Sequence, residues 1–199
     1  MEERRVTQAT RDIRRRRNEL GVTEVGVVLE ARLLRTPADI TAITEKLGPA
    51  ADFRICKGIY LEPAEVAHTG YREVVDAMND CIEAMLDSGA YVGIATHDHP
   101  VIKHSLEALT ARGMGPGIPD PRKGAAPERS GKGPGYEFQM LLGVRGNVRR
   151  RLNSRGHKTR VYLPYGDRWY EYSIRRLREN PDVAAHIARA FLMPWTNRR

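Results

Sequence analysis

The sequence predicts an α/β fold of the (β/α)8, TIM-barrel-like class, incomplete and with about five C-terminal strand–helix units. Strand-like and helix-like segments alternate along the chain, which is the order of a parallel sheet with right-handed crossovers. An open, doubly wound sheet is the alternative, but no GxGxxG turn follows the first strand. Polar residues recur within the strands and can face a barrel interior, while their apolar neighbours pack under helices; the polar residues are Glu30, Arg54, His97, Glu137, Gln139 and Tyr162. The barrel is the better interpretation.

The chain divides into a short N-terminal segment and one domain. Residues 2–20 are highly charged with a weak apolar stripe, so 1–21 is predicted to be a charged N-terminal helix. Residues 22–199 are predicted to form a partial barrel domain that closes with a helix over 183–192. Within it, 113–135 is rich in Gly, Pro, Lys and Arg without periodicity, which predicts a flexible surface insertion.

The first two units have clear local signals. Residues 25–31 form a β-rich run, and the helix 37–47 that follows opens with proline, which is favoured in a first helical turn. Strand 52–57 ends at Gly58, and helix 71–88 carries its apolar residues on one side.

The remaining units follow the same pattern. Strand 91–97 precedes a helix that runs to residue 112 with apolar residues at helical spacing. Strand 136–142 ends at a glycine and leads into the short basic helix 147–155, and the alternating run 160–163 is the last strand.

A strand, a turn and a helix in succession form the strongest candidate site. Tyr162 lies in the last strand, Asp167 can cap the next helix, and Arg175, Arg176 and Glu179 share one side of it. Adjacent guanidinium groups match the two oxygens of a carboxylate. The pattern predicts a site for a small carboxylate ligand; a solvated basic helix face is the alternative.

The amino-acid composition limits the kinds of partner that the chain is expected to bind. The 199 residues are 41% hydrophobic and 29% charged, an ordinary globular balance, and no apolar run reaches a membrane-spanning length. Two cysteines match neither a metal nor a disulfide framework, which favours a reducing cytoplasm. The net charge of +8 invites a nucleic-acid partner, but much of the excess lies in the runs 14–17 and 149–151, with few aromatics beside them. We therefore expect no nucleic-acid partner.

Five motifs together carry a family resemblance: RICKGIY from Arg54, ATHD from Ala95, YEFQMLLG from Tyr136, RVYLPYG from Arg160 and YSIRRLREN from Tyr172. Over about residues 22–192 the chain resembles the FAD-dependent proline dehydrogenases, most of all the monofunctional bacterial type, and covers the C-terminal part of their barrel. The resemblance implies oxidation of L-proline to Δ1-pyrroline-5-carboxylate in proline catabolism, with electrons passed from FAD to a quinone. It also implies a cytoplasmic enzyme in peripheral contact with the inner face of the membrane.

The resemblance also implies roles for individual residues. Arg175 and Arg176 would clamp the proline carboxylate, Glu179 would orient them, and Tyr162 would pack against the substrate ring. Arg54 would stabilise negative charge at the reactive edge of the flavin. The cofactor-binding residues by the same motifs are Glu30, Arg54, Lys57, Gly58, Tyr60, Ala95, Thr96 and His97.

Each role has a structural alternative. Arg54 could be a cation in a buried ion-pair network, His97 a hydrogen-bonded pocket residue, and Asp98 only the cap of the next helix. Glu137 and Gln139 could be structural hydrogen-bonding groups within the barrel.

Two departures separate this chain from the family. Glu30 stands where the family usually has glutamine near the flavin pyrimidine ring. The early strands, with a lysine and an aspartate of the active site, are absent, so a complementing N-terminal segment or an oligomer is expected. A non-catalytic remnant or interaction module that retains the barrel motifs is the alternative function.

Overall fold

The computed structural model describes residues 26–58, 62–120, 131–163 and 165–167, together with the single positions 171 and 174. The elements in chain order are β1 (Val27–Glu30), α2 (Thr36–Leu47), η1 (Gly48–Ala50), β2 (Asp52–Cys56), α3 (Tyr71–Asp87), β3 (Tyr91–Ala95), α4 (His99–Ala111), β4 (Tyr136–Leu141), α5 (Gly146–Ser154) and β5 (Thr159–Tyr162). They agree with the predicted strand–helix units to within a few residues at each end. The predicted helices 2–20 and 183–192 lie outside the described residues.

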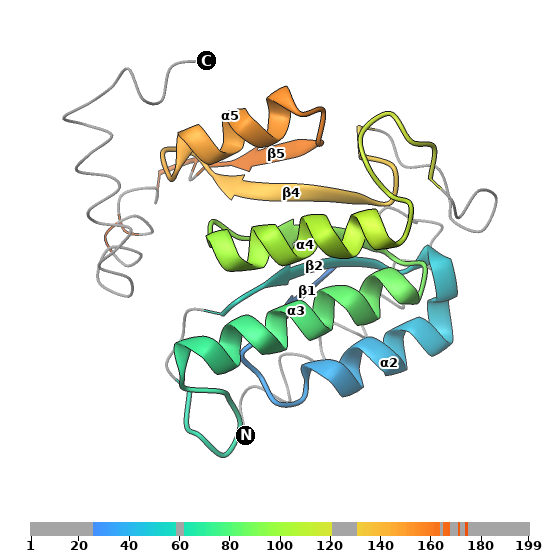
Figure 1. The fold of residues 1–199 in the computed structure, drawn as a ribbon. Helices are drawn as coiled ribbons and strands as arrows, with labels where there is room; N and C mark the ends of the chain where they lie inside the picture. The colour runs from blue at the N-terminus through green and yellow to red at the C-terminus, as the bar shows by residue number, and fades with distance from the viewer. Residues whose placement is uncertain are drawn as a thin grey trace.

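The five strands form one parallel sheet in the order β1-β2-β3-β4-β5, so each strand pairs with the next one along the chain. Figure 1 shows the helices α2, α3, α4 and α5 gathered in front of the strands. Sequential parallel strands with helices on one side are the arrangement of a (β/α)8 barrel wall, whereas a doubly wound sheet places helices on both faces. The barrel interpretation is therefore confirmed for these five units.

The face of the sheet under the helices, here called the outer face, is apolar. Its residues are Val27, Leu29, Phe53, Ile55, Val92, Ile94, Tyr136, Phe138 and Met140, each at most 5% exposed. They pack with the apolar sides of α2, α3 and α4 into one core. The alternation in the last predicted strand also places Leu163 on this face, but Leu163 is 56% exposed because it lies beyond the end of the edge strand β5.

The opposite, inner face is mainly polar. Its residues are Val28, Glu30, Asp52, Arg54, Cys56, Tyr91, Gly93, Ala95, Glu137, Gln139, Leu141, Arg160 and Tyr162, as the strand register places them side by side. Val28 is 54% exposed there, whereas its neighbour Val27 on the outer face is 4% exposed. The outer face is thus buried along the described strands β1 to β4, whereas exposure on the inner face ranges from none at Glu137 to 54% at Val28.

The described ends of the predicted insertion 113–135 pack against the sheet. Met114 is buried in the core, and Lys132 forms an ion pair with Asp52. The amide of Gly133 donates to the Tyr91 hydroxyl at 3.1 Å. Residues 121–130 lie outside the described part, so their predicted flexibility stays a prediction.

Helix ends in the described part are set by local chemistry. Pro37 lies in the first turn of α2, and Glu73 accepts a hydrogen bond from the amide of Gly70 at the start of α3.

None of the described helices combines the length and apolar character needed to cross a membrane.

Candidate functional site

Two predicted site residues meet on the inner face. Arg54 projects from β2 and Tyr162 from β5, and the Arg54 guanidinium carbon lies 5.3 Å from the centre of the Tyr162 ring. A guanidinium over a tyrosine face is held by the ring quadrupole, with its donor edges directed outward. Four of the other predicted site residues, Tyr60, Arg175, Arg176 and Glu179, lie outside the described residues.

A continuous line of hydrogen bonds runs from Arg54 across the inner face. The Arg54 Nε donates to the Gln139 side-chain oxygen at 2.8 Å, and the Gln139 amide nitrogen donates to Glu137 Oε1 at 2.7 Å. Arg160 donates to both oxygens of Glu137, at 2.6 and 2.9 Å. The sequence left open whether Glu137 and Gln139 are structural, and these contacts show that both belong to a hydrogen-bonding network.

Glu137 is an ionised carboxylate with no exposed surface. Burial alone would raise its pKa, but the hydrogen bonds from Arg160 and Gln139 and the charge of Arg160 outweigh burial and lower the pKa. Burial and the nearby Glu137 charge raise the pKa of Tyr91, whose hydroxyl also hydrogen bonds to the carboxylate. The Glu137 charge is therefore compensated within the sheet by Arg160.

Gly93 provides the space for this network. A methyl group at its Cα would lie 2.5 Å from the Gln139 amide nitrogen and 3.1 Å from the amide carbon. Both are far inside ordinary contact distance, so glycine on β3 allows the amide to lie flat between β2 and β4.

A second cluster lies at the carboxyl ends of β2 and β3. Lys57 forms an ion pair with Asp98, the Tyr71 hydroxyl donates to the same carboxylate at 2.8 Å, and the Lys57 ammonium lies 4.4 Å from the Tyr71 ring centre. Burial opposes ionisation of Asp98, but the bonds from Lys57 and Tyr71 outweigh it and lower the pKa. Asp98 precedes α4 at the capping position yet makes no side-chain cap bond, so the helix-cap interpretation is wrong: its carboxylate is used by Lys57 and Tyr71.

His97 connects this cluster to β4. Its Nε2 accepts a hydrogen bond from the Leu141 amide at 3.1 Å, and its carbonyl oxygen accepts one from Arg145 at 2.9 Å. The predicted alternative for His97, a hydrogen-bonded pocket residue, is consistent with these contacts. Arg145 has φ of 45°, a left-handed conformation that is unfavourable for arginine and aims its side chain back at the strand ends.

The other predicted cofactor residues lie around the same edge. Ala95 ends β3 and Thr96 follows it; both are nearly buried, and the Thr96 hydroxyl accepts a bond from the Asp98 amide at 3.0 Å. Gly58 has φ of 86°, and a methyl group there would approach the Glu30 carboxylate to 2.8 Å. Glu30 and Gly58 are thus in contact, as a shared site requires.

The donor set of this edge fits a flat, hydrogen-bond-accepting group that becomes anionic. Arg54 carries a positive charge on the inner face, where its contacts within the described residues are the Gln139 amide oxygen and the Tyr162 ring. Lys57 and Arg145 add positive charge at the strand ends, where ligands of barrel folds bind. A flavin has this character, so the residues present fit the cofactor that the family resemblance implies.

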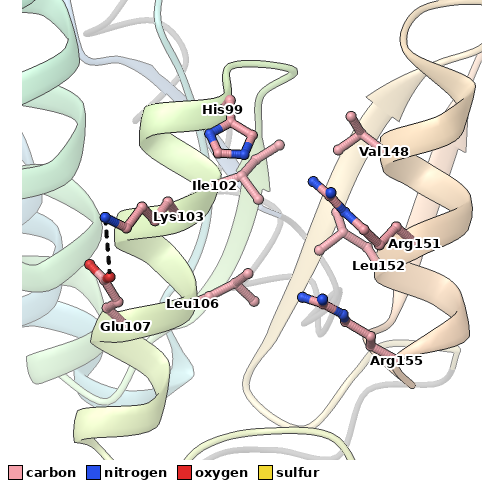
Figure 2. Close-up of a pocket in the computed structure, with 9 residues that line it drawn as sticks. All are labelled: His99, Ile102, Lys103, Leu106, Glu107, Val148, Arg151, Leu152 and Arg155. Atoms are coloured by element: carbon pink, nitrogen blue, oxygen red, sulfur yellow. Dashed lines mark ion pairs between the residues drawn. The ribbon is translucent and has the colours of Figure 1, made fainter.

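A cavity of about 300 Å³ lies elsewhere, between α4 and α5. Figure 2 shows the residues that line it. Its floor is apolar and its rim basic; the lining residues are His99, Ile102, Lys103, Leu106, Glu107, Val148, Arg151, Leu152 and Arg155. It lies between helices on the outer side of the sheet and contains none of the predicted site residues, so it is not the candidate active site.

Sequence reasoning missed Arg160, Gly93, Tyr71 and Arg145. Arg160 could have been found, because it has the same strand parity as Tyr162 and so shares its face. Gly93 and Tyr71 have no signal of their own, since their roles depend on the register between strands and on the path of the loop after β2.

Comparison with known proteins identifies relatives of the whole described region. A family model described as proline dehydrogenase matches residues 1–189. Proline dehydrogenase of Deinococcus radiodurans is 35% identical over 174 residues, which are 87% of this chain and 50% of the relative. Proline dehydrogenase 2 of Bacillus subtilis strain 168 is 36% identical over 167 residues, 84% of this chain and 48% of the relative. The chain thus spans about half the length of the curated relatives it matches.

Solved structures agree on the fold. Proline utilization A from Bdellovibrio bacteriovorus, inactivated by N-propargylglycine, superposes with a TM-score of 0.65 at 22% identity, over 81% of this chain and 17% of that one. Proline utilization A from Bradyrhizobium japonicum gives a TM-score of 0.60 at 19% identity, over 83% and 17%. The likeness shows the fold, and the matches together confirm the resemblance that the five motifs predicted.

Proposed function

The chain belongs to the proline dehydrogenase family, and we propose from this premise that it contributes the greater part of a site that oxidises L-proline to Δ1-pyrroline-5-carboxylate. FAD is the proposed cofactor, and a quinone is the proposed acceptor of its electrons. The observation that carries the proposal is the Arg54 guanidinium, which lies on the inner face over the Tyr162 ring and is hydrogen-bonded to the neutral amide of Gln139.

The chemistry needs such a cation. When bound, FAD would accept a hydride from the carbon of proline next to the nitrogen and become negatively charged. A fixed guanidinium stabilises that charge without reorganising, because its orientation is already set by Gln139 and Tyr162. Lys57, Gly58, Tyr60, Ala95, Thr96, His97 and Glu30 are the residues proposed to hold the cofactor.

Substrate binding is proposed to fall to the arginine pair. Arg175 and Arg176 would bind the proline carboxylate and Glu179 would orient them, while Tyr162 would bound the ring from β5. A clamp of this kind sets the distance and angle of the reacting carbon, which lowers the entropy cost of the reaction. Peripheral contact with a membrane, where quinones dissolve, is part of the same proposal.

One experiment separates this function from a non-catalytic one. Flavin absorbance after gel filtration and proline-dependent dye reduction are measured on the chain alone, and again after mixing with the stretch of the Deinococcus relative that the match leaves out. We expect weak FAD binding and little turnover alone, because the described sheet has five of the eight strands of a barrel, and yellow, active protein after mixing. Failure of well-folded protein to bind FAD in both cases would favour a non-catalytic module.

The arginine pair is tested in the active mixture. Arg175→Met or Arg176→Met should raise KM for proline steeply and leave the flavin content unchanged. The fall in kcat/KM should correspond to a loss of about 2–4 kcal/mol of transition-state stabilisation. Arg149→Met, in the basic run of the outer helix α5, is the matched control and should leave both parameters as they are. Unchanged kinetics in both pair variants would reduce Arg175 and Arg176 to a solvated helix face.

A further inference from the structure

We propose that Glu137, Gln139 and Arg160 are positioning residues that hold the Arg54 guanidinium in one orientation while leaving its charge available to a ligand. That the charge of Arg54 stabilises a bound flavin rests on the proposed function. The positioning itself rests only on contacts within the described residues.

The orientation of Gln139 follows from its two partners. The guanidinium of Arg54 can only donate hydrogen bonds, and the ionised Glu137 can only accept them. The amide therefore has to turn its oxygen to Arg54 and its nitrogen to Glu137, and the distances of 2.8 and 2.7 Å show both bonds made. A flipped amide would lose both bonds, so Gln139 has a single satisfied state.

Glu137 provides the fixed end of this line. It has no exposed surface, and Arg160 grips both of its oxygens in a bidentate contact at 2.6 and 2.9 Å. Bidentate pairing fixes the plane of the carboxylate as well as its position. The fixed carboxylate of Glu137 holds the Gln139 amide in one orientation through their hydrogen bond. The amide oxygen of Gln139 then holds the Arg54 guanidinium in the same way.

Gln139 also separates charges. It lies between Arg54 and Glu137, so the carboxylate is neutralised by Arg160 and not by Arg54. The bond to Gln139 uses only the Nε of Arg54, and this network does not occupy its two terminal nitrogens. A neutral spacer at this position keeps the cation both oriented and electrostatically active, which a direct ion pair with Glu137 would prevent.

Two substitutions at one position separate orientation from charge. Gln139→Leu removes both hydrogen bonds, whereas Gln139→Glu retains an acceptor for Arg54 but places a negative charge against it. Asp39→Asn is the matched control, because Asp39 is a nearly buried carboxylate on α2, away from the inner face, and accepts hydrogen bonds of 2.8 and 3.0 Å from Arg35, the residue before this helix.

Orientation is measured on the chain without cofactor. In 15N-labelled protein, the exchange rate of the Arg54 Nε proton with solvent should rise about tenfold or more in Gln139→Leu, and should stay low in Asp39→Asn; in Gln139→Glu it should stay below the rate in Gln139→Leu, because an acceptor for Arg54 remains although the bond to Glu137 is lost. Equal exchange in the wild type and Gln139→Leu, with folding verified by circular dichroism, would overturn the positioning role.

Charge is measured on FAD-loaded protein through the reduction potential of the flavin. Gln139→Glu should lower the potential, because the reduced, anionic flavin loses part of its cationic neighbour, while Asp39→Asn should leave it unchanged. A potential unaffected by Gln139→Glu would refute the spacer role. A wild type that takes up no FAD under any loading condition would refute the proposed function instead, and the proton-exchange result would still decide the positioning role.

Discussion

Replacing Gly93 with alanine should destabilise the protein through Gln139. The added methyl group would lie 2.5 Å from the Gln139 amide nitrogen and 3.1 Å from its amide carbon, while the next atom, the Phe53 carbonyl oxygen, is at an ordinary 3.4 Å. The side chain of Gln139 has to move, and in moving it gives up its bonds to Arg54 and Glu137. The φ angle of Gly93 is not in the left-handed region, so the backbone conformation at this position is also accessible to alanine. The expected cost therefore comes from the clash with Gln139.

The magnitude follows from these two bonds. A hydrogen bond to a charged partner contributes about 1.5–3 kcal/mol, less where water can replace it, and Gln139 is half-buried. Alanine in place of glycine returns about 0.5–1 kcal/mol by reducing the backbone freedom of the unfolded chain. The net loss in unfolding free energy should be about 2–4 kcal/mol.

A double-mutant cycle by urea denaturation checks the cause as well as the size. In a Gln139→Ala background the clashing atoms are gone, so Gly93→Ala should then be neutral or slightly stabilising. Gly115→Ala is the control, because its methyl group would meet only Ile118, at 3.5 Å. Equal costs of Gly93→Ala in both backgrounds would show that the clash with Gln139 is not the reason, and the network argument would fail at that point.

Three further outcomes are expected. Burial and a neighbouring arginine lower the pKa of His157, so its contribution to stability is full above its unfolded pKa of about 6.5 and is lost as the pH falls toward the folded value; His157→Gln should flatten the decline of the unfolding free energy below about pH 7, and an unchanged profile would contradict the buried, neutral imidazole. Replacing residues 121–130 with a short Gly-Ser linker should change Tm by no more than about 2 °C, since loop closure depends weakly on length; a larger drop by calorimetry would show that the segment packs. Tyr71→Phe should raise the pKa of Asp98, followed by carboxyl-carbon NMR, yet leave it below the ordinary value because the lysine partner remains; an unmoved pKa would contradict the hydrogen bond.

Strand parity made much of the fold predictable. Phe53 and Ile55 flank the polar Arg54, and Leu29 precedes the polar Glu30; because successive side chains of a strand point to opposite faces, the two faces of the sheet were assigned before any contact was known. The same rule brought Arg54 and Tyr162 to one face, where the structure places them in contact.

Side-chain partners could not be predicted in the same way. Whether Arg54 pairs with a carboxylate or an amide depends on the register of β2, β3 and β4, which a single sequence does not report. Aspartate is a favoured residue at a helix N-cap, but the Asp98 carboxylate makes no cap hydrogen bond to α4 and instead forms an ion pair with Lys57. A charged contact across elements outweighs a local propensity here.

The coincidence of strand order with chain order has a consequence for biosynthesis. Each strand that leaves the ribosome finds its neighbour already formed, and none has to be inserted between two strands that are already paired. The growing sheet can therefore be assembled one unit at a time during translation. Because the inner face of the growing sheet is mainly polar, a half-synthesised chain exposes few apolar groups on that face to which chaperones or other nascent chains could bind.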